Sequence, residues 1–338
     1  MTQTAPASTP ADHATATVGA DRLRRVLRAV TVAACVPYLG LKIAWIAGSS
    51  VGVPEGTTLL DHQAEMAVAN GVTVLMDATV IVLALLLTRP WGLRVPAWLL
   101  VFPMWAATGL LTPIMTGFPL QLVVWAFGGS VRTADEGGEP FLREWVFGVV
   151  YGGFIVQGLA LGALFALYAR GRWGHLWRGR VWDLPRAVGT ADRVLATVAA
   201  VVALLPLTAH AVWASGGTTA LAQGRIADRT ADFYVLQVQS AVLLAVAVTG
   251  GLLLAFRRGR ALPVGVPLVL AWVGSAATAC WAAWLAVASL LSLGDAAHRP
   301  TTGTVLAYAG EMITGVLVAG LVTSFLTARS AAANRRTP

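Results

Sequence analysis

Eight long apolar runs constrain this chain more than any other feature of its sequence. A helix rises about 1.5 Å per residue, so about 20 apolar residues cross the hydrocarbon core of a bilayer. Of the 338 residues, 57% are hydrophobic and only 12% are charged, whereas about a quarter of the residues of a soluble domain are charged. The sequence therefore predicts an all-α polytopic membrane helix bundle. Its eight transmembrane helices are expected at residues 26–47, 67–88, 95–115, 145–168, 193–215, 233–256, 262–291 and 303–327.

The arginines indicate how these helices are oriented. An even number of spans places both termini on one side of the membrane. If that side is the cytoplasm, the inner segments hold eighteen arginines and the outer segments hold five. Positively charged loops stay preferentially in the cytoplasm. We therefore expect a multi-pass protein of the bacterial cytoplasmic membrane with both termini cytoplasmic. The net charge of +8 then reflects topology, and no nucleic acid partner is expected.

The two halves of the chain resemble each other. A shift of 168 positions superimposes identical residues of the first and fifth runs: Arg25 on Arg193, Trp45 on Trp213 and Gly48 on Gly216. A shift of 157 superimposes Tyr151 of the fourth run on Tyr308 of the eighth. The first half thus carries extra residues, which we assign to an outer loop insertion near 116–144. Four spans per copy give both copies the same orientation, so the sequence predicts two parallel four-helix repeats.

This organisation predicts the following segments. Residues 1–20 form a disordered cytoplasmic tail, 21–170 the first repeat, 171–192 a cytoplasmic linker, 193–329 the second repeat and 330–338 a second cytoplasmic tail. The apolar stretch 118–127 within the insertion is too short to span. We expect it either to lie in the outer interface or to dip back as a re-entrant loop.

Small residues four positions apart indicate where helices pack closely, because only small side chains let backbones approach within a membrane. Gly158 and Gly162 form one such pair in the fourth run. Gly315 and Ala319 form the corresponding pair in the eighth run.

Common catalytic motifs are missing from the sequence. Lys42 is the only lysine, which excludes a Walker A loop. His210 is the only histidine within a span, which argues against a bis-histidine haem. Cys35 and Cys280 lie far apart without the spacing of a metal site. The sequence therefore predicts neither a cofactor nor a metal, and a role other than an enzyme is favoured.

Four ionisable residues lie inside the spans: Lys42, Asp77, His210 and Glu311. Such residues are costly in a bilayer unless they are paired or hydrated, and they commonly mark functional sites. We expect Lys42 to pair with Asp77 and His210 with Glu311. The functional interpretation is one outward-facing substrate or ion site with Asp77 at its floor. The alternative is that these residues are ion pairs that only fix the helix packing.

The pattern LKxxWxxG at 41–48 and its variant HxxWxxGG at 210–217 resemble uncharacterised multi-pass membrane proteins of actinobacteria. That resemblance implies no activity. The leading hypothesis is a transporter or permease-like protein for a small solute, an ion or a lipid-like molecule, because parallel repeats and buried charges suit alternating access. One alternative is a membrane-integral enzyme or enzyme subunit that acts on a lipid or quinone. Another is a non-catalytic partner or immunity-type protein. Membrane lipid is an expected partner in each case, and a membrane protein partner or a homo-oligomer stays open.

Overall fold

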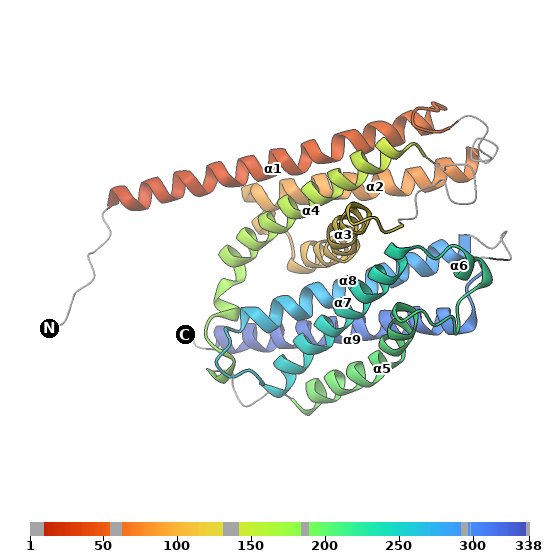
Figure 1. Ribbon diagram of the computed structural model, residues 1–338. Helices are drawn as coiled ribbons and strands as arrows, with labels where there is room; N and C mark the ends of the chain where they lie inside the picture. The colour runs from red at the N-terminus through yellow and green to blue at the C-terminus, as the bar shows by residue number, and fades with distance from the viewer. Residues whose placement is uncertain are drawn as a thin grey trace.

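The computed structural model describes residues 10–54, 63–130, 142–183, 189–291, 297 and 299–335. These residues form a bundle of long helices with short connections (Figure 1). The long helices are α1 (Pro10–Ile46), α2 (Gln63–Thr88), α3 (Ala97–Ala126), α4 (Glu144–Trp173), α5 (Thr190–Ala214), α7 (Ala231–Phe256), α8 (Gly265–Leu291) and α9 (Thr302–Asn334). The short ones are α6 (Gln223–Ala227) and the 3-10 turns η2 (Pro90–Arg94), η3 (Gly174–Trp177) and η4 (Val181–Asp183).

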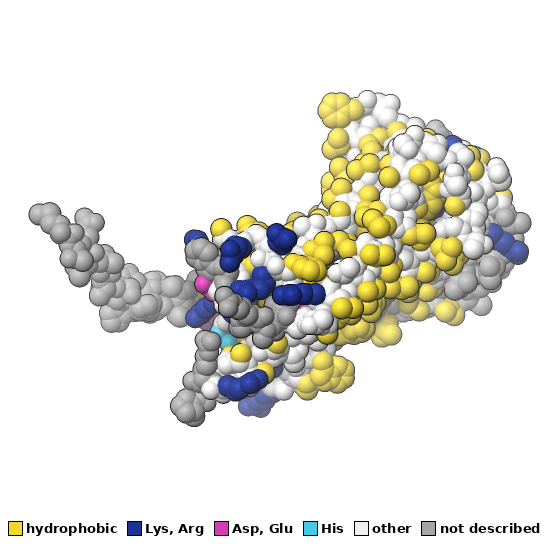
Figure 2. All heavy atoms as spheres, turned by 90° about the horizontal axis from the view of Figure 1, so that it is seen from below, with side chains coloured by type: hydrophobic (Ala, Val, Ile, Leu, Met, Phe, Trp, Pro, Cys, Tyr) yellow, Lys and Arg dark blue, Asp and Glu magenta, His cyan; other side chains and the backbone are white. Residues whose placement is uncertain are grey.

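All eight long helices contain a segment long and apolar enough to cross a membrane. The predicted helix bundle is therefore confirmed, and the chain is a multi-pass integral membrane protein. Helix α1 begins and α9 ends at the same end of the bundle, which we call the terminal face (Figure 1). The opposite end, where α1 ends and α9 begins, is the distal face. Figure 2 shows that most of the Lys and Arg side chains visible on this face lie towards the terminal face, whereas hydrophobic side chains cover much of the rest of the bundle.

The helices form two groups. Helices α1, α2 and α4 pack on one another, and α5, α7, α8 and α9 pack on one another. Helix α3 lies between the groups (Figure 1), where it contacts α4 on one side and α7 and α8 on the other. It has only a few contacts with α2, its neighbour in the chain.

Polar contacts and one glycine fix α3 against the second group. The Trp105 indole donates to Ser275 Oγ over 3.1 Å, and Gln239 Nε2 donates to the Pro113 carbonyl oxygen over 2.8 Å. A Cβ atom at Gly109 would lie 2.2 Å from the Ala276 carbonyl oxygen, so the backbones of α3 and α8 touch there. These contacts hold α3 away from α2.

Three helix ends differ from the expectation. Helix α1 begins at Pro10, so residues 10–20 are helical rather than a disordered tail, while residues 1–9 lie outside the described residues. Helix α9 continues to Asn334, which makes most of the expected tail 330–338 helical, although 336–338 are not described. Both segments are rich in alanine, the best helix former. Helix α3 continues to Ala126. Residues 118–126 therefore extend that helix and form neither a separate interfacial helix nor a re-entrant loop.

The small residues differ in how closely they pack. A Cβ atom at Gly315 would lie 2.6 Å from the Ser275 carbonyl oxygen of α8, and one at Gly158 would lie 2.4 Å from Met115 Sδ of α3. The space around Gly162 is open to 4 Å, so the expected close contact there is wrong. Ala319, the partner of Gly315 in the sequence pattern, is half-buried.

Candidate functional site

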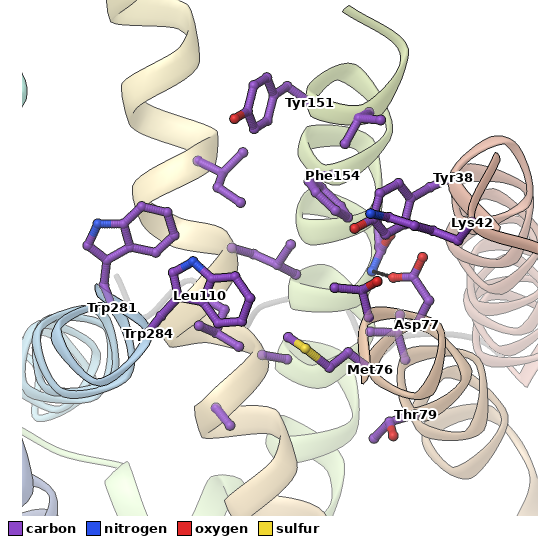
Figure 3. A pocket seen from close by; sticks show the side chains of 18 of the residues that line it. Tyr38, Lys42, Met76, Asp77, Thr79, Leu110, Tyr151, Phe154, Trp281 and Trp284 are labelled. Carbon is purple, nitrogen blue, oxygen red and sulfur yellow. Dashed lines mark hydrogen bonds between the residues drawn. The ribbon is translucent and has the colours of Figure 1, made fainter. Parts of the chain in front are cut away.

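A cavity of about 500 Å³ lies between the first group of helices and the pair α3 and α8. This volume falls within the roughly 300–1,000 Å³ of small-molecule sites. Figure 3 shows Lys42 and Asp77 on one side of it and Trp281 and Trp284 on the other. The lining is contributed by α1, α2, α3, α4 and α8, together with Leu142 just before α4.

The cavity occupies the gap between α2 and α3. In the second group, a Cβ atom at Gly250 of α7 would lie 2.3 Å from the Ala271 nitrogen of α8, so those two helices touch. If the predicted repeat with its shift of 168 positions extends over these helices, Val82 of α2 and Pro103 of α3 are the corresponding positions. Both carry side chains larger than those of the touching pair, so this close approach cannot be repeated between α2 and α3. Pro103 lines the cavity instead.

The cavity is closed towards the terminal face and open at its side. Buried residues of α2, α3 and α4 form a hydrophobic core on the terminal side of the cavity, among them Leu83, Leu100, Met104, Leu161 and Leu164. Thr79 and Phe102 line the cavity and are also exposed on the surface of the molecule. Because both lie within apolar spans, this opening faces the membrane.

One wall of the cavity, which contains Lys42, Asp77 and Gln157, is polar. Lys42 is the cation of this polar wall. It lies near the end of α1, and its Nζ donates to Asn70 Oδ1 of α2 over 2.8 Å. The same Nζ lies 5.0 Å from the centre of the Tyr38 ring and 4.9 Å from that of the Trp45 ring. Contacts of an ammonium with aromatic faces are favourable, and more so away from water. This environment accommodates the lysine within an apolar span.

Asp77 and Gln157 form the second part of the polar wall. Gln157 Nε2 of α4 donates to Asp77 Oδ1 of α2 over 3.3 Å. Gln157 is 2% exposed and Asp77 is 3% exposed. The other two oxygens, Asp77 Oδ2 and Gln157 Oε1, have no hydrogen-bond partner within the described part of the chain. Both residues line the cavity, and both unpaired oxygens are buried.

The opposite wall is apolar and aromatic. It consists mainly of α3 and α8 side chains: Ala106, Ala107, Leu110, Leu111, Ile114, Trp281 and Trp284. A ligand that fits both walls therefore combines a polar end with an apolar body.

A second polar cluster lies in the other group of helices. His210 Nε2 of α5 contacts Glu311 Oε1 of α9 at hydrogen-bonding distance, and both residues are buried. His210 Nδ1 lies 2.8 Å from Gln237 Oε1 of α7. An imidazolium donates to both oxygens. A neutral ring keeps both contacts if the Gln237 amide turns over and donates its N–H. The cluster can therefore hold or lose a proton without losing a hydrogen bond.

The structure divides the four predicted site residues between two places. Lys42 and Asp77 line one cavity, but no ion pair links these two described side chains, because Lys42 binds Asn70 instead. His210 contacts Glu311, as expected from the sequence. Glu311 lines a separate cavity of about 90 Å³, and Trp281 lines both cavities. The single shared site expected for all four residues is therefore wrong.

Three amides that complete these clusters were not predicted from the sequence: Asn70, Gln157 and Gln237. An amide in an apolar span indicates a polar contact between helices, since it needs a hydrogen-bond partner there. Among the described residues, no group of three or more histidine, cysteine, aspartate or glutamate side chains has the arrangement of a metal site.

The fold is that of a multi-pass membrane protein with an internal cavity of about 500 Å³. Comparisons with known protein families, with curated proteins and with solved structures give no match.

Proposed function

We propose that this protein is a permease-like carrier that binds an amphipathic, lipid-like small molecule in the cavity between α2 and α3 and moves it across the membrane. The observation that carries this proposal is the cavity itself: about 500 Å³, with apolar walls and one polar side. Its opening at Thr79 and Phe102 gives a membrane-dissolved molecule direct access.

The closed terminal side supports a transport cycle. In the structure the cavity lies on the distal side of the core that contains Leu100 and Leu161. Movement of the ligand to the terminal face requires that core to open, as alternating access demands. Most arginines of the sequence belong to the segments that adjoin the terminal face, and positively charged segments stay preferentially in the cytoplasm. We therefore place the terminal face in the cytoplasm. In that orientation the cavity lies on the outer side of the closed core.

A duplication of four helices supports the same proposal. The turns after α1 and α5 have the same hydrogen bonds: the Trp45 indole donates to Val51 O over 2.7 Å, and the Trp213 indole donates to Thr219 O over 2.9 Å. Gly48 and Gly216 follow those helices with φ values of +86° and +93°. Parallel repeats with a site between helices are a known architecture of transporters. We infer that the cavity arose where the two copies diverged.

The test uses three probes with the same eight-carbon chain: octanoic acid, octylamine and 2-aminooctanoic acid. Binding to the protein in lipid nanodiscs is followed by tryptophan fluorescence, since Trp45, Trp281 and Trp284 line the cavity. At least one probe is expected to bind saturably, and Ala106→Phe should abolish that binding by filling the cavity. Ala166→Phe on α4 is the matched control, because Ala166 is exposed on the surface.

The probe that binds is then followed by counterflow in proteoliposomes. Protein-dependent movement that Ala106→Phe abolishes is the expected result. Saturable binding without movement would contradict transport and favour a membrane enzyme or a partner protein. Absence of binding for all three probes would contradict the proposal as a whole.

A further inference from the structure

Two oxygens of the cavity wall need hydrogen-bond donors. Asp77 Oδ2 and Gln157 Oε1 have no partner in the described residues, and both side chains are more than nine-tenths buried. Buried acceptors are costly when they stay unpaired. The two side chains are already joined through Asp77 Oδ1, so their free oxygens belong to one cluster. A ligand group that brings two or more N–H donors fits this cluster, and a primary ammonium brings three.

Lys42 needs hydrogen-bond acceptors from the same ligand, whereas Asp77 and Gln157 need donors. Its ammonium has three donors, and among the described side chains Asn70 is its one hydrogen-bond acceptor. The neighbouring Tyr38 and Trp45 rings cover it without accepting a conventional hydrogen bond. Lys42 and Asp77 lie on the same side of the cavity (Figure 3). A carboxylate or phosphate bound at Lys42 would therefore lie close to an ammonium bound at Asp77 and Gln157.

Ligands with a single charge satisfy only half of this wall. An anion at Lys42 leaves the two acceptor oxygens unpaired and brings a negative charge near Asp77. A cation at Asp77 brings a positive charge near Lys42. A neutral molecule leaves both charges of the wall without a counterion from the ligand. Only a head group with both charges meets every demand of Lys42, Asp77 and Gln157.

We propose that the cavity selects a zwitterionic amphipath. Its primary ammonium binds Asp77 and Gln157, its anionic group binds Lys42, and its apolar chain lies along α3 and α8 between Leu110 and Trp284. This proposal names the substrate class and rests on the function proposed above. A primary ammonium, an anionic group and an apolar chain occur together in apolar amino acids and in lipids whose head group carries a primary amine. Comparing probes of the two kinds separates these sources.

The test compares the dissociation constants of the three eight-carbon probes in nanodiscs. We expect 2-aminooctanoic acid to bind at least about tenfold more tightly than octanoic acid or octylamine, equivalent to about 1.4 kcal/mol. Asp77→Asn and Gln157→Leu should weaken the amino acid towards the affinity of octanoic acid. Lys42→Met should weaken it towards that of octylamine, and Lys42→Arg should retain the preference because it retains the cation. The ranking for the unaltered protein does not depend on whether any variant folds.

A short-chain phosphatidylethanolamine is then used as a competitor. If it displaces 2-aminooctanoic acid, a lipid head group is the source of the zwitterion; if it does not, a free amino acid is. Equal affinities for the three probes, or a preference for a probe with one charge, would overturn the zwitterion proposal but leave the proposed function in place. Saturable binding of none of the probes would overturn the proposed function itself.

Discussion

At the scale of single residues, the two polar clusters differ in how they are paired. Lys42 and Asp77 bind neutral amides, whereas His210 and Glu311 bind each other and are 4% and 5% exposed. A group with a neutral partner is free to exchange it for a ligand. A buried His–Glu contact is instead part of the packing of α5 against α9, and we assign it first to stability.

Double-mutant cycles on His210 and Glu311 test this assignment. Removal of one partner from a buried pair costs about 3–5 kcal/mol, because the other partner stays buried and unpaired. His210→Leu and Glu311→Leu should each lower the free energy of unfolding by about this amount in mixed micelles. The double variant should lose less than the sum of the two. Additive losses would mean that the two side chains do not interact.

The sequence predicted the charged residues of both clusters but not their grouping. A charge inside an apolar run stands out, so Lys42, Asp77, His210 and Glu311 could be identified from composition alone. Their neighbours depend on how the helices rotate and pack. Their positions inside the spans suggested one site, but α3 and α8 lie between the two clusters. Gln157 lies next to Asp77 only because α2 packs on α4.

At the scale of helices, a few glycines determine which backbones touch. Gly315 faces α8, where a Cβ atom added to it would lie 2.6 Å from the Ser275 carbonyl oxygen and 2.6 Å from Ala279 Cβ. Gly320, on the same helix, is exposed and has open space around it. The two glycines therefore form a matched pair within α9.

Valine substitutions at these two positions should have different effects. Gly315→Val forces α8 and α9 apart, and overpacking of this kind costs about 1–3 kcal/mol or more. Gly320→Val should change stability little, since the new side chain faces the membrane. Thermal unfolding in detergent measures both variants. Similar melting temperatures for the two would contradict the close packing of α8 on α9.

The position of α3 is the feature of the fold that the sequence did not reveal. Periodicity and length predicted all eight spans, because each span must satisfy the bilayer by itself. Strict repetition would have placed α3 beside α2, as α8 lies beside α7. The separation of α3 from α2 depends on Gly109, Trp105 and Gln239, which hold α3 against the second group. Single contacts of this kind leave no periodic pattern.

At the scale of the whole molecule, the orientation in the membrane follows from the arginine distribution. Both ends of the described chain lie at the terminal face (Figure 1). We predict that a phosphatase active only outside the cytoplasm will be inactive when fused after Pro338. The same enzyme inserted after Gly128, at the distal end of α3, should be active. Activity in the first fusion would contradict the orientation and place the terminal face outside the cytoplasm.

Crystals grown with 2-amino-8-bromooctanoic acid would show whether the cavity between α2 and α3 binds an amphipathic molecule. The anomalous signal of bromine locates the end of the chain without reference to any activity. We predict a bromine peak beside Leu110 and Trp284, with the head group between Lys42 and Asp77. Bromine on the outer surface of the bundle, with the cavity unchanged, would contradict binding in the cavity.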